Sequence, residues 1–262
     1  MDLGLKGKIA LVAAASRGLG LAIAEELAAE GASLIICARG ADALHAARDA
    51  IAARGAEVEA IVADLSTANG IAAVAAAALQ RHGRVDVLVT NSGGPPAGRF
   101  DAHDWSVWQN AVDLLLRSAV ELTRAVLPGM RERRWGRIIN VTSIAVKQPV
   151  DNLILSNSIR AAVTGWARTL ANEVAAEGVT VNNILPGYTR TERVESLARS
   201  TATAEGIDAA AVTARFTSQI PMRRLGEPRE FAALAAFLAS ERASFITAQS
   251  IAVDGGWVKG LV

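Results

Sequence analysis

Short apolar runs alternate with stretches of helical periodicity along most of the chain. The runs have the length of strands and occupy residues 9–13, 33–38, 57–63, 85–90, 137–141, 179–185 and 250–253. Helical patterns occupy residues 19–30, 42–54, 105–133, 153–176 and 228–240, and a further helix precedes the fourth strand. Continuous apolar runs are typical of strands that are covered on both faces. The alternation therefore predicts a doubly wound α/β fold, in which about seven parallel strands form one sheet between two layers of helices.

Residues at the ends of the predicted helices support these boundaries. Gly31 and Gly178 directly follow helical patterns, at the position where glycine commonly adopts a left-handed conformation. Asp104 precedes the helix at 105–133, and its carboxylate is suited to cap the first turn. No linker, repeat or change in composition divides the chain, so we expect a single domain over residues 1–262.

Residues 188–221 interrupt the alternation. They follow directly on the sixth predicted strand, and ligands of doubly wound sheets bind beyond the carboxyl ends of the strands. A long segment at that position is a candidate lid over a substrate. The alternative is a helical surface insertion without a role in binding.

Composition narrows the possible functions. The 262 residues carry a net charge of +1, so nothing suggests nucleic acid or an anionic membrane as a partner. The apolar runs fall short of the ~20 residues that a membrane span requires, and we expect no signal peptide. The single cysteine, Cys37, fits a reducing cytoplasm. The histidines lie far apart without metal-ligand spacing, so we expect no metal.

The turn after the first strand has the composition of a phosphate-binding turn. Gly18 and Gly20 allow close approach of the backbone to a ligand, and the helix that starts there directs free N–H groups and its positive dipole end at it. Doubly wound folds bind a pyrophosphate in this way. Ala14 stands where the first glycine of the dinucleotide fingerprint is usual, so this motif alone is equally compatible with a plain strand–helix turn.

Several stretches together resemble the short-chain dehydrogenase/reductase family. Residues 13–20 resemble its TGxxxGxG segment, and residues 90–93 resemble its NNAG segment. Ser143, after the fifth strand, matches the catalytic serine of the family. Residues 186–191 resemble PGxxxT, and residues 220–228 and 253–256 resemble its closing segments, as in 3-oxoacyl-[acyl-carrier-protein] reductases. The resemblance covers essentially the whole chain and implies a Rossmann-type fold.

The resemblance implies a nicotinamide dinucleotide as cofactor. An acid after the second strand would favour NAD, because it accepts a hydrogen bond from the ribose hydroxyl and repels a phosphate. Here Arg39 follows that strand and Arg17 lies nearby, so we expect NADP rather than NAD. The alternative is that Arg39 is solvated and Arg17 pairs with an acid. The expected cofactor-binding residues are Ser16, Arg17, Gly18, Leu19, Gly20, Arg39, Asp64, Leu65, Asn91, Gly93, Arg160, Pro186, Gly187 and Thr191.

The catalytic set of the family is altered in this chain. Its tyrosine, which donates a proton to the carbonyl oxygen, corresponds to Ser156, and its lysine corresponds to Arg160. Its asparagine, part of a water-linked proton path, corresponds to Asp113. A serine hydroxyl is a far weaker acid than a phenol, and arginine keeps its proton in proteins. General acid–base catalysis is typically worth ~10²–10⁴-fold, so something must replace it if the chain is an efficient enzyme.

Three replacements are possible. Tyr188 follows the segment near the nicotinamide, Lys147 follows Ser143 in the chain, and Ser156 can act through a bound water. The alternative is that Tyr188 packs within the lid and Lys147 is solvated. Asp113 and Arg160 can also replace the proton path by a direct ion pair, and the alternative is independent drift of the two positions.

Two classes of function remain open at this point. The first is an NADP-dependent oxidoreductase that acts on a carbonyl, 3-oxoacyl-like or another ketone, with unusual acid–base groups. The second is a dinucleotide-binding protein without redox turnover, and a non-redox reaction is a third possibility. The family also implies a homo-oligomer, tetramer or dimer, for which the apolar stripe with Ala161 and Trp166 is a candidate face. We expect a small-molecule substrate.

Overall fold

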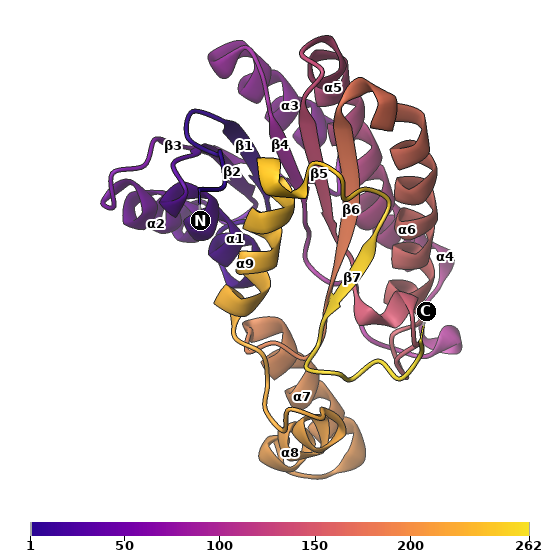
Figure 1. Cartoon of the computed structure of the whole chain (residues 1–262). Coiled ribbons are helices and arrows are strands. Elements are labelled where there is room, and N and C mark those ends of the chain that lie inside the picture. Colours follow the sequence, from indigo (N-terminus) through magenta and orange to yellow (C-terminus); the bar gives the residue numbers. More distant parts are fainter. Residues whose placement is uncertain (1, 262) are drawn as a thin grey trace.

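Seven parallel strands form one twisted sheet in the computed structural model, which describes residues 2–261. The sheet order is β3-β2-β1-β4-β5-β6-β7, so the connection changes direction between β1 and β4 (Figure 1). The strands are β1 (Ile9–Ala13), β2 (Ser33–Ala38), β3 (Val58–Val62), β4 (Val87–Thr90), β5 (Gly136–Val141), β6 (Val179–Pro186) and β7 (Ser250–Val253). This confirms the predicted Rossmann-type fold, because each buried apolar run has become a strand.

Helices cover both faces of the sheet (Figure 1). One face packs against α1 (Gly18–Ala29), α2 (Ala41–Ala52) and α9 (Pro228–Ala239). The other packs against α3 (Ala68–His82), α5 (Ser118–Glu132) and α6 (Ile154–Val174). Two apolar cores therefore hold the sheet between them, and strands β1 and β2 are almost entirely buried.

The long helix predicted at 105–133 is divided by a wider turn. It consists of α4 (Trp105–Val112), a π-helical turn (Asp113–Arg117) and α5. The Asp104 carboxylate accepts a hydrogen bond from Val107 N at 3.1 Å, as expected of a helix cap. A π turn holds an additional residue, so it rotates the side chains on either side of it relative to an uninterrupted α-helix.

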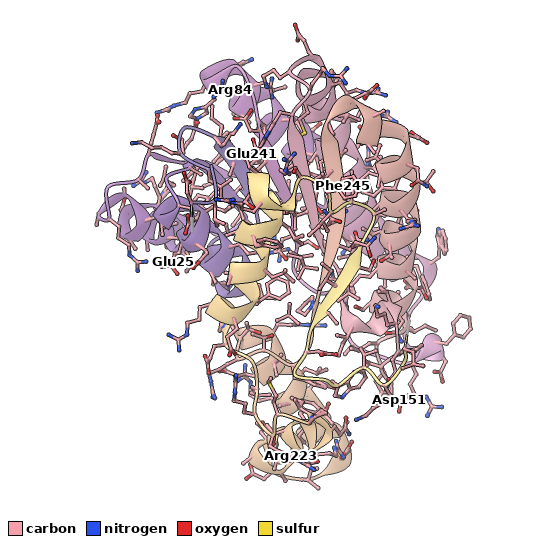
Figure 2. All side chains as sticks on the ribbon, viewed as in Figure 1. Glu25, Arg84, Asp151, Arg223, Glu241 and Phe245 are labelled. Carbon is pink, nitrogen blue, oxygen red and sulfur yellow. The ribbon has the colours of Figure 1, made fainter. Side chains whose placement is uncertain are left out.

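Residues 188–221 form two helices, α7 (Glu192–Glu205) and α8 (Ala209–Gln219). They have a small apolar core of their own, which includes Ala202, Val212 and Phe216. They lie beyond the carboxyl ends of the strands, apart from the two helical layers, and Arg223 marks the loop that follows them (Figures 1 and 2). Within residues 2–261, no helix has the length and apolar character to cross a membrane.

The predicted stripe on α6 does not form one uniform face. Val163 is buried, and Trp166 and Leu170 pack against the core of the sheet. Ala161 and Ala162 are exposed. The stripe is therefore mainly a core-facing one, with a small exposed margin.

Polar side chains form a hydrogen-bonded row across four strands inside the protein. Thr90 donates to Asn140 Oδ1 at 2.6 Å, and Asn140 donates to Asn183 Oδ1 at 3.0 Å. Asn183 in turn donates to Ser250 Oγ at 3.1 Å. Because buried polar groups are costly when unpaired, this row favours one relative placement of β4, β5, β6 and β7. It thereby positions the strand ends that carry the site described below.

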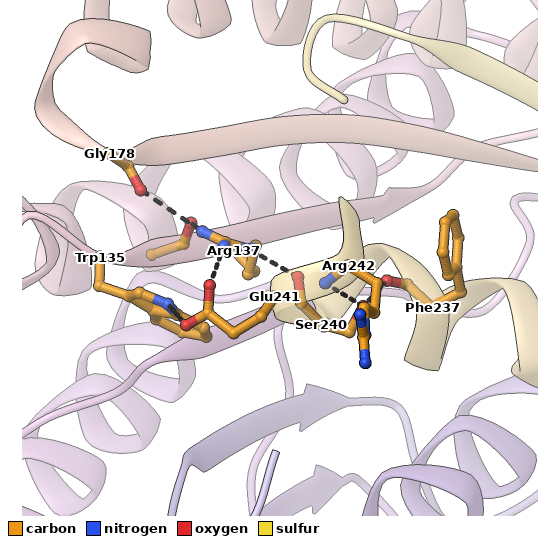
Figure 3. Close-up of polar contacts among 8 residues, drawn as sticks. Trp135, Arg137, Gly178, Phe237, Ser240, Glu241 and Arg242 are labelled. Carbon is orange, nitrogen blue, oxygen red and sulfur yellow. Dashed lines mark hydrogen bonds and ion pairs between the residues drawn. The ribbon is translucent and has the colours of Figure 1, made fainter. Parts of the chain in front are cut away.

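Arg137 is the largest fully buried side chain, at 2% exposure, and lies at the start of β5 (Figure 3). Its guanidinium donates to the carbonyl oxygens of Gly136 at 2.9 Å, Ser240 at 3.3 Å and Gly178 at 3.4 Å. It also contacts Glu241 at 3.5 Å and lies 4.3 Å from the centroid of the Trp135 ring. Burial lowers the pKa of Arg137. This cluster joins the start of β5 to the end of α9. It lies at the amino ends of the strands, whereas the site described below lies at their carboxyl ends.

Candidate active site

A cleft of about 500 Å³ lies at the carboxyl edge of the sheet and spans the point where the strand order reverses. Residues that follow six of the seven strands line this main cleft, among them Ala14, Arg39, Asp64, Asn91, Ser143 and Gly187. Ligands of doubly wound sheets bind at this location. Its volume is within the usual range for small-molecule sites, roughly 300–1,000 Å³.

The glycine turn approaches the cleft with little room for side chains. Gly18 has a φ of +60°, and a Cβ on Gly20 would lie 2.3 Å from the Ala14 carbonyl oxygen. Asn91 Nδ2 donates to the same oxygen at 3.4 Å. The turn leads directly into α1, whose free N–H groups face the cleft, so the residues present fit a dinucleotide pyrophosphate.

Ala14 occupies this turn in a left-handed conformation, with a φ of 50°. Such a conformation costs a non-glycine residue roughly 1–2 kcal/mol, whereas glycine adopts it freely. We expect Ala14→Gly to increase the free energy of unfolding by about 0.5–1 kcal/mol after the added freedom of the unfolded chain is subtracted, measured by urea denaturation. Ala53→Gly is the matched control, because Ala53 is exposed with a φ of −61° and should lose stability. An unstabilised Ala14→Gly would contradict the interpretation.

One end of the cleft is lined by Arg17, Arg39 and Asp64. Arg17 forms an ion pair with Glu192 at the start of α7, the alternative considered above for this residue. Asp64 accepts hydrogen bonds from Ser66 N at 2.9 Å and Ser66 Oγ at 2.8 Å. These bonds, led by the one from the Ser66 backbone, lower the pKa of Asp64, and Arg39 contributes to the same shift. The carboxylate is therefore ionised at neutral pH.

At the other end, Ser143, Ser156 and Arg160 converge on the same cavity. Ser143 precedes a short 3₁₀ turn, and its Oγ accepts a hydrogen bond from Ala145 N at 3.1 Å. Ser156 and Arg160 lie one helical turn apart on α6 and are 7% and 9% exposed. Arg160 donates to the Val141 carbonyl oxygen at 2.7 Å. Burial, together with Arg193, lowers its pKa to about 10, so the guanidinium remains charged near neutrality.

The segment after β6 closes this end of the cleft. Gly187 N donates to the Val253 carbonyl oxygen at 3.0 Å, and a Cβ on Gly187 would lie 2.7 Å from Asp254 Cα. Thr191 lies over the glycine turn, since its Cγ2 would be 3.7 Å from a Cβ on Gly18. The structure therefore brings together the predicted cofactor-binding residues Ser16, Arg17, Gly18, Leu19, Arg39, Asp64, Leu65, Asn91, Gly93, Arg160, Pro186, Gly187 and Thr191 around one cavity, with Gly20 immediately behind it.

Two candidates for the altered catalytic set lie elsewhere. The Asp113 carboxylate contacts Arg117 at 3.5 Å and accepts a hydrogen bond from Gln109 at 3.3 Å. The predicted ion pair with Arg160 is therefore wrong, since Asp113 pairs with Arg117 and its neighbour Leu114 lines the cleft. Lys147 is exposed at the end of the 3₁₀ turn and does not line the cavity.

Tyr188 lines the main cleft but is also part of an aromatic cluster. Its ring stacks on Phe216 with centroids 4.4 Å apart and meets Trp257 edge-on at 6.0 Å. Burial raises the pKa of its hydroxyl, so Tyr188 is protonated at neutral pH. The cluster anchors α8 to the segment after β6, which agrees with the packing role considered for this residue.

Arg193 is a residue that the sequence did not single out individually. It lies near the start of α7, donates to the Pro95 carbonyl oxygen at 2.9 Å and lines the main cleft. It also lines an outer groove of about 1020 Å³, which includes Arg99, Asp151, Phe216 and Trp257. The two hollows share Val150, Tyr188, Arg193, Ser196 and Leu197. The sequence contains one indication of this role, which is the position of Arg193 within residues 188–221, the candidate lid.

Known proteins share this architecture and much of the sequence. The family model described as enoyl-(acyl carrier protein) reductase matches residues 13–258. The chain is 35% identical over 252 residues to the 3-oxoacyl-[acyl-carrier-protein] reductase FabG of Vibrio cholerae, covering 96% of this chain and 98% of that protein. It is 34% identical over 253 residues to dehydrogenase/reductase SDR family member 4 of Oryctolagus cuniculus, covering 96% and 94%. The crystal structure of L-sorbose reductase from Gluconobacter frateurii, complexed with NADPH and L-sorbose, is similar with a TM-score of 0.94, 35% identity and 100% of both chains covered.

Proposed function

This chain belongs to the short-chain dehydrogenase/reductase family, and from that premise we propose that it is an NADPH-dependent reductase of a carbonyl compound, 3-oxoacyl-like or another ketone. The observation that carries the proposal is the shared cleft. One end has a glycine turn with Arg17 and Arg39, and the other has Ser143, Ser156 and Arg160. A dinucleotide extended along the cleft would place its reactive ring beside those three side chains.

Arg17 and Arg39 are proposed to bind the ribose phosphate of NADPH. The structure of L-sorbose reductase, which contains NADPH, supports the choice of cofactor. Arg17 must exchange Glu192 for the phosphate, and both partners of that ion pair are largely exposed, so the exchange costs little.

When bound, NADPH supplies a hydride to the carbonyl carbon. The Ser143 and Ser156 hydroxyls are proposed to donate hydrogen bonds to the carbonyl oxygen, and the Arg160 guanidinium stabilises the negative charge that develops there. The proton that completes the alcohol comes from water, because neither serine nor arginine readily releases one. Water reaches the site through the outer groove, and Ser156 Oγ can pass the proton on.

Binding and turnover test this proposal separately. NADPH and NADH are titrated into the purified protein, and absorbance at the reduced-nicotinamide band is then followed with a panel of ketones that includes 3-oxoacyl thioesters. Tight NADPH binding with turnover supports the reductase. Tight binding without oxidation on any substrate favours a dinucleotide-binding protein without redox turnover, a candidate supported by the exposed position of Lys147 and the packing of Tyr188. Failure to bind either cofactor contradicts both.

Arg39 provides a test of cofactor preference. We expect Arg39→Glu to weaken NADPH binding about tenfold, roughly 1.4 kcal/mol, while NADH binding is retained, because the new carboxylate repels the ribose phosphate. Kd values from fluorescence titration measure both effects. Arg48→Glu is the matched control, since Arg48 lies outside the cleft and contacts Asp49. Equal weakening of NADPH and NADH by Arg39→Glu would contradict the assignment.

Two further features belong to the proposal. We infer that the whole chain acts as a single domain in which residues 188–221 serve as a lid, supported by the hydrogen bond from Arg193 on α7 to the Pro95 carbonyl across the cleft. We also infer a dimer or tetramer, and the exposed Ala161 and Ala162 on α6 are compatible with close approach of a second copy.

A further inference from the structure

Two arginines face the reactive end of the main cleft without an acidic partner. Arg160 is buried, and the one hydrogen bond that its guanidinium makes within residues 2–261 goes to the Val141 carbonyl. Arg193 likewise bonds only to the Pro95 carbonyl. No carboxylate of the described residues forms an ion pair with either guanidinium. Buried charge without a partner is unfavourable by several kcal/mol, and this cost falls on Arg160, whereas Arg193 is exposed. An anionic ligand that reaches Arg160 would offset the cost, with Arg193 as a second cation beside it.

The charges elsewhere in the cleft are already balanced. Arg17 pairs with Glu192, and Arg39 lies near Asp64, whose pKa it helps to lower. These four side chains with Arg160 and Arg193 are the charged groups that line the main cleft among the described residues. The excess of positive charge is therefore confined to the end with Ser143 and Ser156.

The proposed cofactor does not supply the missing negative charge at this end. Its phosphates are assigned to the glycine turn, Arg17 and Arg39, and the reduced nicotinamide ring is neutral. Loss of a hydride would leave that ring positively charged, and Arg160 and Arg193 would then lie in the same region as a third cation. Repulsion between charges a few ångströms apart is substantial in a partly desolvated site. A negative charge on the substrate would offset it as the reaction proceeds.

We propose that the substrate is an oxo acid, whose carbonyl oxygen is held by Ser143 and Ser156 while its carboxylate is held by Arg160 and Arg193. This inference rests on the proposed reductase activity and specifies its substrate class. A guanidinium presents paired N–H groups that match a carboxylate. Ser156 and Arg160 line the same cavity, one helical turn apart on α6. Hydride adds to the carbonyl carbon, the π pair moves to the oxygen, and a proton from water gives the hydroxy acid.

The rest of such a molecule would extend into the outer groove. Arg193 lines both hollows, so a carboxylate bound there lies at their junction. Beyond it, the stacked rings of Tyr188 and Phe216 and the edge-on ring of Trp257 form a flat apolar wall. Asp151, labelled in Figure 2, lines the same groove together with Arg99 and Arg215, so both signs of charge are present there and the aromatic wall is the feature that a tail would meet. The tail is therefore expected to be apolar.

Matched pairs of substrates test the inference with the full-length protein and NADPH. The pairs are 2-oxobutanoate with its methyl ester and 3-oxohexanoate with its methyl ester, which differ in charge but not in the carbonyl group that is reduced. We expect kcat/KM to favour the acids about tenfold or more. Arg193→Met should raise KM about tenfold more for the acids than for their esters, so that the preference for the acids is lost. Arg199→Met is the control on the same helix, since Arg199 pairs with Glu195 outside both hollows.

Equal kcat/KM for acids and esters, or an equal effect of Arg193→Met on both, would overturn the inference while leaving the reductase proposal intact. If no substrate turns over, calorimetric titration tests the carboxylate site by itself. Hexanoate and its uncharged amide, hexanamide, which cannot be reduced, are each titrated into the protein with and without NADP⁺. Binding of hexanoate that Arg193→Met abolishes supports the anion site even if the reductase proposal fails. Absence of hexanoate binding under both conditions overturns it.

Discussion

Ser156→Tyr combined with Arg160→Lys is expected to raise kcat for ketone reduction about 100-fold. The double variant introduces a phenol that can donate a proton to the carbonyl oxygen and a lysine that lowers the pKa of the phenol, and general acid catalysis of this kind contributes ~10²–10⁴-fold. Ser156 lines a cleft of about 500 Å³, which offers space for the larger ring. Steady-state kinetics with NADPH and a neutral methyl ketone measure the effect without involving the proposed carboxylate site.

The control for this variant is Ser156→Phe combined with Arg160→Lys, which has the same ring without the hydroxyl. Equal rates for the two double variants would show that proton donation does not limit reduction in this protein. The pH dependence supplies a second distinction. Arg160 stays charged up to its pKa of about 10, so kcat of the unmodified protein should stay constant from neutral pH to that value. The tyrosine variant should lose activity at lower pH, as its phenol ionises.

Arg137→Ala is expected to lower the free energy of unfolding by about 3–4 kcal/mol. The substitution removes a buried side chain, leaves the carbonyls of Ser240 and Gly178 without this donor and eliminates the contact with Trp135. At roughly 2–4 °C per kcal/mol for a chain of this size, Tm should fall by about 6–16 °C. Urea denaturation measures the free energy, and calorimetry measures Tm.

Two further variants separate the causes of that loss. Arg137→Met retains apolar volume and should cost about 1–2 kcal/mol, because well-packed apolar side chains often replace buried charges without large penalties. Arg242→Ala removes an exposed neighbouring arginine and should have little effect. NADPH affinity should be unchanged in all three variants, since β5 separates Arg137 from Ser143 by roughly 20 Å. Loss of NADPH affinity in folded Arg137→Ala would show that the cluster also supports the site.

The sequence was sufficient to predict the sheet and most helices, because the strands are buried on both faces and read as continuous apolar runs. Helix bounds differ by one or two residues, as at α2, where hydrogen bonding rather than composition decides the last turn. The division of 105–133 by a π turn was not predictable, since an additional residue within a helical turn leaves no compositional trace. The ion pair predicted for Asp113 was wrong because its carboxylate contacts Arg117, a side-chain contact that the resemblance used to assign this position does not reveal.

Site residues could be predicted from the sequence where their location depends only on following the end of a strand. Gly18, Asn91 and Gly187 each follow a strand, and parallel strands end at one edge of the sheet. Lys147 was misplaced because a 3₁₀ turn directs it to solvent. Arg193 was not predictable from the sequence because its position depends on a tertiary contact, the hydrogen bond from Arg193 on α7 to the Pro95 carbonyl. Side chains that bridge distant segments require the folded structure.

The contacts at the start of α7 bear on the order in which molecules enter the protein. Glu192 holds Arg17 on one side of the main cleft, and Arg193 holds Pro95 on the other. The outer groove is also lined by residues within 97–102 and 148–152, and neither Arg17 nor Glu192 lines it. A small molecule can therefore enter the groove while the Arg17–Glu192 ion pair stays in place. If α7 opens to admit the dinucleotide and closes over it, the dinucleotide enters first and leaves last, while the smaller reactant exchanges through the groove. In a cell, the balance of reduced to oxidised dinucleotide would then decide which fraction of the molecules is ready to receive substrate.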